Sequence, residues 1–209
     1  MALTLTTKLV AVNTMLIGIG EAPVNTLNSG LQEAEIAGIM LDNISREVQS
    51  KGWAFNTDLR YSLPTNTDNE IVVPFNCLYV DTRLIRRDYD KDVILRDGKL
   101  YDRTQNTFTF TEAVEVDLVY LLDFETIPET ARNYITLRAG RKFQENILGS
   151  PTITQLQSRD ELDALLTLKD AETQSADYNI FDSYDTYRAL DRGVDATKNL
   201  LSSQRILYS

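Results

Sequence analysis

The feature that most constrains the fold is a long helical pattern that stops at a glycine and gives way to aromatic residues. Residues 29–51 carry an apolar stripe at helical spacing, with charged side chains on the opposite face. Gly52 follows directly, where a helix end favours a left-handed backbone that costs glycine little. The only tryptophan, Trp53, and then Phe55 come next. We therefore predict a helix-to-sheet corner at Gly52, Trp53 and Phe55, with the indole ring folded back on the last helical turn.

Four segments have the apolar spacing of amphipathic helices, namely residues 6–19, 29–51, 128–148 and 152–178. In the second, Ser29 is a candidate N-cap, and Gln32 completes a capping box. In the third, Pro128 suits the first helical turn. The apolar stripe of the third consists of Ala131, Ile135, Ala139, Phe143 and Ile147. The apolar residues of the fourth are Leu156, Leu162, Leu165, Leu166 and Leu168.

The segment between the second and third helices is rich in strand patterns. After the corner, apolar residues alternate, which is typical of a strand: Trp53, Phe55, Leu59, Tyr61 and Leu63. Short runs bounded by turn residues follow at 71–73, 78–80, 93–95, 99–101, 108–110 and 116–122. Asp97-Gly98, between two of these runs, strongly indicates a type I′ hairpin.

These patterns predict an α+β protein in which helices from both ends of the chain form a bundle and carry a β-rich insertion. The bundle domain comprises residues 1–52 plus 127–178, and the insertion comprises residues 53–126. Residues 179–209 are aromatic, polar and without a clear period, so we expect an extended C-terminal tail.

The composition excludes several classes of function. Asp and Glu number 31 against 21 Lys and Arg, so the formal net charge of −10 disfavours a protein that grips DNA phosphates. Histidine is absent, which removes the commonest general base and any His-ligated metal site. The apolar run 9–19 is interrupted by polar residues and is shorter than the roughly 20 residues that span a bilayer. We predict a soluble cytoplasmic product with no catalytic residues, metal, cofactor or membrane contact.

Two groups of residues are candidates for contacts with other proteins. Arg138, Arg141 and Lys142 form the one dense basic face, which is either a solvated helix surface or a contact with an acidic neighbouring subunit. The second group consists of tail aromatics, which favour protein interfaces: Phe181, Tyr184, Tyr187 and Tyr208. These aromatics either fold back on their own domain or contact another subunit, and we favour the second interpretation.

Several segments, in this order, resemble the tail tubular protein A family of short-tailed bacteriophages. They are Ala11-Val12-Asn13, Ile19 to Val24, Gln49 to Asn56, Asp97-Gly98, Tyr101 to Thr104, Ile127-Pro128-Glu129, Ala139 to Gln144 and Gly149-Ser150-Pro151. The resemblance covers about residues 9–182, whereas the chain beyond about 185 diverges.

The resemblance implies a structural, non-enzymatic protein of the virion, made in the host cytoplasm. Members of the family form a dodecameric adaptor ring between the portal and the tail nozzle. The ring attaches tail fibres, and genomic DNA passes through its centre during ejection without specific binding.

Two other functions remain open from the residues alone. A small carboxylate-dependent hydrolase could use Asp160, Glu161 and Asp163, or Asp123 with Glu125, provided that the two acids flank a cleft. A monomeric peptide-binding module could instead recognise its partner through the aromatic tail. A monomer with a deep acidic cleft would favour the hydrolase, whereas one dominant small partner would favour the peptide-binding module.

Overall fold

The computed structural model describes residues 4–82, 91–149 and 151–175, with the side chains of 155–174 in the last range. The chain divides into two compact units, Met1–Glu172 and Thr173–Ser209. All elements below belong to the first unit, except for the last residues of the fourth helix.

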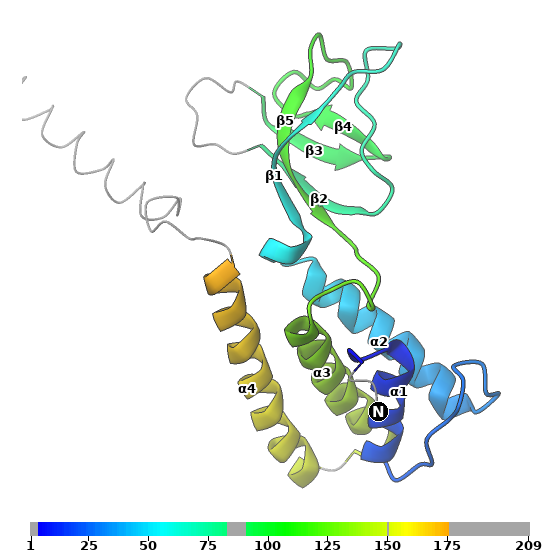
Figure 1. Cartoon of the computed structure of the whole chain (residues 1–209). Coiled ribbons are helices and arrows are strands. Elements are labelled where there is room, and N and C mark those ends of the chain that lie inside the picture. The colour runs from blue at the N-terminus through cyan, green and yellow to red at the C-terminus, as the bar shows by residue number, and fades with distance from the viewer. Residues whose placement is uncertain (1–3, 83–90, 150, 176–209) are drawn as a thin grey trace, which may run out of the picture. The chain divides into compact units, whose positions relative to one another are not determined.

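Helices flank a β-rich middle segment, and the α+β class is confirmed (Figure 1). The helices are α1 Lys8–Gly18, α2 Gln32–Gln49, α3 Glu129–Ile147 and α4 Pro151–Ser175, with a short 3₁₀ turn, η1, at Ala54–Asn56. The strands are β1 Thr57–Leu63, β2 Cys77–Asp81, β3 Val93–Arg96, β4 Lys99–Asp102 and β5 Val114–Tyr120.

The first core lies among the helices. Buried side chains of α1, α2 and α3, such as Leu16, Leu41 and Phe143, form one cluster, to which α4 contributes Ala164 and Leu168. The predicted stripe of α3 is correct over its first four members, which are fully buried, but Ile147 in the last turn is 43% exposed. The helical pattern therefore identified the packing face of α3 but not where that face ends.

The prediction for the start of α2 was wrong. The helix begins at Gln32 with Leu31 as its N-cap, and no side chain caps it. Ser29 Oγ instead accepts a hydrogen bond from the Leu31 backbone N–H, 3.3 Å away. Gly30, with a φ of 76°, turns the chain between these residues, so the capping box cannot form.

The second core lies within the β-rich segment. Strands β1, β5 and β2 form an antiparallel sheet in that order, and β3 pairs with β4 as a hairpin. Asp97 and Gly98 both have positive φ, 52° and 73°, as the type I′ prediction requires. The runs 71–73 and 108–110 form only isolated bridges, which differs from the strands expected there. The described residues thus contain two separate hydrophobic cores, and the predicted domain division stays a prediction.

The corner after α2 joins the two cores. Gly52 has a φ of 71°, and the Trp53 indole N–H donates to the carbonyl of Val48, 2.8 Å away, so the ring folds back on α2. The strand begins only at Thr57, which means that Trp53 and Phe55 precede it rather than alternate within it. The side chain of Asn56 accepts a hydrogen bond from the Trp53 N–H and thereby stabilises the turn η1.

A buried glutamine then connects α2 to the chain that follows β5. Gln49 is 0% exposed, and its Nε2 donates to the Leu122 carbonyl at 2.9 Å. The Leu122 N–H donates back to Gln49 Oε1 at 2.8 Å, so both backbone groups of Leu122 bind one side chain. Asn56 Nδ2 donates to the backbone carbonyls of Gln49 and Tyr120. Because buried polar groups need partners, these bonds fix how α2 meets the sheet.

Candidate functional site

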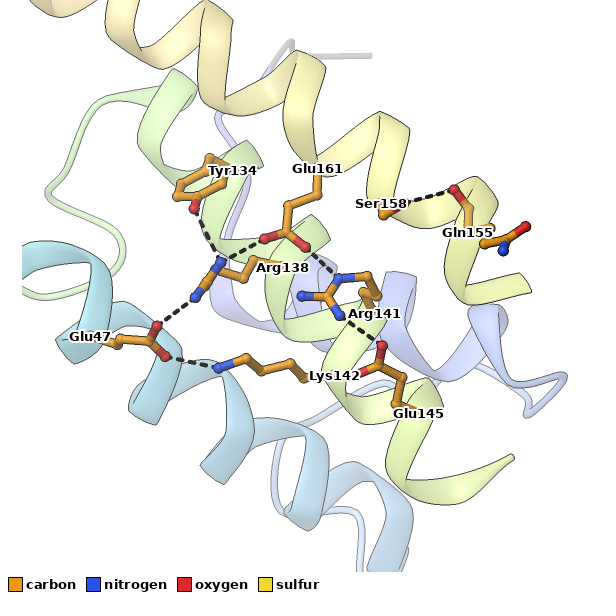
Figure 2. Close-up of polar contacts among 9 residues, drawn as sticks. All are labelled: Glu47, Tyr134, Arg138, Arg141, Lys142, Glu145, Gln155, Ser158 and Glu161. Atoms are coloured by element: carbon orange, nitrogen blue, oxygen red, sulfur yellow. Dashed lines mark hydrogen bonds and ion pairs between the residues drawn. The ribbon is translucent and has the colours of Figure 1, made fainter. Parts of the chain in front are cut away.

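The basic residues singled out in the sequence lie in a charge network that spans three helices (Figure 2). The cations Arg138, Arg141 and Lys142 all belong to α3. Their carboxylate partners come from α2, from α3 itself and from α4: Glu47, Glu145 and Glu161. We refer to these six residues as the charge network.

Glu161 and Glu47 each bridge two cations. One oxygen of Glu161 binds Arg138 Nη1 at 2.7 Å, and the other binds Arg141 Nε. Glu47 likewise binds Arg138 Nη2 and, at 3.0 Å, Lys142 Nζ. Positive and negative groups therefore alternate from α2 across α3 to α4.

The helical repeat explains why α3 can present this face. Residues 138, 141, 142 and 145 are three or four positions apart and so share one side of a helix. The buried residues Ala139 and Phe143 alternate with them and face the core. Arg141 and Glu145 pair across one helical turn at 2.7 Å, which is a spacing visible in the sequence.

Glu161 is the most enclosed acid of the network, with its side chain 11% exposed. Burial alone would raise the pKa of Glu161, but hydrogen bonds from Arg141 and Arg138 outweigh it, so the pKa lies below its usual value. Hydrogen bonds from Lys142 and Arg138 likewise hold the pKa of Glu47 below its usual value. Both carboxylates are thus held ionised.

This electrostatic state does not suit Glu161 for the hydrolase chemistry left open by the sequence. A catalytic general acid needs a raised pKa, whereas that of Glu161 is lowered. Its neighbours Asp160 and Asp163 are exposed on α4. Glu125 accepts a hydrogen bond from the Lys8 backbone N–H at 3.2 Å, at the start of α1. Glu161 therefore stabilises the contact of α4 with α3, and Glu125 stabilises the start of α1.

Large apolar side chains on the outer surfaces of the helices form a feature that sequence periodicity missed. Val10 and Ile17 of α1, Ile39 of α2, and Leu162 and Leu166 of α4 are each about half exposed or more. Of the apolar residues named for α4 in the sequence, Leu168 is buried, whereas Leu162 and Leu166 are not. Such surfaces are commonly contact sites for other proteins.

The tail aromatics lie outside the described residues: Phe181, Tyr184, Tyr187 and Tyr208. Over the described ranges, no group of three or more His, Cys, Asp or Glu residues could hold a metal ion. No helix in those same ranges is long and apolar enough to cross a membrane.

Comparisons with known proteins match most of the chain. A family model described as tail tubular protein matches residues 9–178. The tail tubular protein A of Klebsiella phage KP34 is 32% identical over 142 residues, which cover 68% of this chain and 74% of that protein. The range matched by the family model contains Gly52 and every member of the charge network, and it ends before Phe181.

Proposed function

This chain belongs to the tail tubular protein family and is a structural component of a bacteriophage tail, and from that premise we propose that it forms the adaptor ring between portal and tail nozzle. The match over residues 9–178 is the observation that carries the proposal, because it includes both cores of the fold. The proposed ring is a dodecamer that also attaches the tail fibres.

The exposed apolar side chains of the helices support contacts between copies. Ile17 of α1 and Ile39 of α2 are 61% and 62% exposed, although both lie on helices whose opposite faces pack into the core. Contacts that are not two-fold symmetric close into rings when the rotation between copies fits a closed cycle. In the proposed ring, the helices of neighbouring copies pack side by side and the β-rich segment faces the nozzle.

The acidic charge of the chain supports a channel for DNA rather than a DNA-binding surface. The formal net charge of −10 repels phosphates, so a bore lined by part of it would let the duplex slide. Genomic DNA would then pass through during ejection without specific binding.

The portal contact is assigned to the aromatic tail and to the basic face of α3. Phe181, Tyr184, Tyr187 and Tyr208 supply the large apolar surface that interfaces favour. The basic residues are candidates for contact with an acidic neighbouring subunit, although each pairs with a carboxylate of its own chain here: Arg138, Arg141 and Lys142.

Deleting residues 180–209 tests the assignment of the tail. We expect the shortened protein to fold, because both cores lie before residue 169, and to lose binding to the portal in a pull-down assay. A second variant, the full-length chain with its four tail aromatics replaced by serine, should lose binding as well. Portal binding at the full-length level by either variant would refute the assignment.

A further inference from the structure

Helix α4 is attached to the rest of the molecule in a different way from the other helices. The backbones of α1, α2 and α3 approach one another closely, whereas that of α4, over its described residues, lies farther from them. Long side chains bridge the difference, because Arg138 and Arg141 reach from α3 to Glu161 (Figure 2). The ion pairs of Glu161 therefore link α4 to α3, beside the apolar contacts of α4 with the core and the hydrogen bond that Glu172 accepts from the Ala54 N–H.

The apolar contact of α4 with the core comes from few side chains. From residue 155 onward, Ala164 and Leu168 are buried in the core, and Leu165 packs against it partly buried. Three other leucines of α4 keep about half of their surface in solvent, since Leu156, Leu162 and Leu166 are 60%, 54% and 49% exposed. These three leucines therefore contribute less hydrophobic stabilisation than buried ones would.

The charge network can lose α4 without leaving either arginine without a carboxylate. Arg138 also binds Glu47, and Arg141 also binds Glu145, so α2 and α3 keep their own ion pairs. Arg138 Nε is buried and has no hydrogen-bond partner. Loss of a bridging carboxylate is least costly where its cations keep other partners.

We propose that α4 is a releasable arm that Glu161 latches to α3. When Glu161 leaves, the arm separates as a unit while α1, α2 and α3 keep their fold. Release leaves Arg138 paired with Glu47 and Arg141 paired with Glu145. Release of α4 needs only the isolated chain, whether or not the chain forms an adaptor ring.

Hydrogen–deuterium exchange of the full-length chain tests the latch through Glu161→Gln. The substitution weakens hydrogen bonds to a charged group, which are among the stronger ones in proteins. We therefore expect backbone amides of residues 155–172 to exchange about tenfold faster or more in the variant than in the wild type. Amides of α1, α2 and α3 should keep the wild-type rate. The matched control is Asp163→Asn, the same acid-to-amide change at an exposed position of α4, which should exchange as the wild type does.

Two outcomes with Glu161→Gln would overturn the proposal. Unchanged exchange in α4 would mean that Glu161 does not hold the helix. Equal acceleration in α1, α2 and α3 would mean that α4 is an integral part of one cooperative fold. The wild-type chain provides a measurement that does not depend on the variant: amides of residues 155–172 should exchange faster than those of α3, and equal protection would contradict the proposal.

Discussion

Replacing Gln49 with leucine is expected to destabilise the protein by about 2–5 kcal/mol, because each buried backbone group left without a partner costs about 1–3 kcal/mol. Leucine has a similar size but can neither accept from the Leu122 N–H nor donate to the Leu122 carbonyl. Both groups would lose their partner at the partly buried junction between α2 and the chain after β5. Urea denaturation measures the loss as a lower midpoint at an unchanged slope.

The control for this substitution is Gln32→Leu in the same helix. Gln32 is exposed in the first turn of α2, so the same chemical change there should alter the free energy of unfolding by no more than about 0.5 kcal/mol. A loss below about 1 kcal/mol for Gln49→Leu would show that the junction tolerates unpaired groups, contrary to the usual cost of leaving them buried.

Replacing Gly52 with alanine is expected to cost about 2–4 kcal/mol, from a left-handed backbone and from overpacking against the sheet. The φ of 71° is one that L side chains rarely adopt, and an added Cβ would lie 3.2 Å from Val119 Cγ2. Gly98→Ala separates the two causes, because Gly98 has a φ of 73° but open space around its Cα. Urea denaturation should give only about 1–2 kcal/mol for Gly98→Ala, the cost of backbone strain alone.

A second variant tests the packing part of the Gly52 argument. Val119→Ala removes the methyl group that the new Cβ would meet, so Gly52→Ala should cost less in that background than in the wild type. An equal cost in both backgrounds would assign the whole effect to backbone strain. A neutral Gly52→Ala would show that the corner does not need glycine.

The sequence predicted those parts of the fold that depend on local spacing. The stripe of α3 and the Asp97-Gly98 hairpin were recognisable because helical period and turn chemistry act over a few residues. The alternation of Leu59, Tyr61 and Leu63 predicted a strand, and β1 is one, although its pairing with β5 is irregular around Arg60, which has a φ of 57°. Leu59 and Tyr61 are 54% and 46% exposed, so the alternation predicted the strand but not which of its residues are buried.

The charge network could be predicted only in part. Arg141 and Glu145 are four residues apart in one helix, so their pairing follows from the sequence. Glu47 lies 91 residues from Arg138, and the two meet only because α2 packs on α3. The sequence therefore predicted the cations of this face, whereas tertiary packing determined which carboxylates neutralise them.

We propose that this chain acts by assembling with copies of itself and with unlike tail proteins. Electron microscopy of the purified full-length chain mixed with its phage's portal protein would make such an assembly visible. We expect a dodecameric ring of this chain seated on the portal. A chain that stays monomeric, with portal particles that carry no added density, would contradict it.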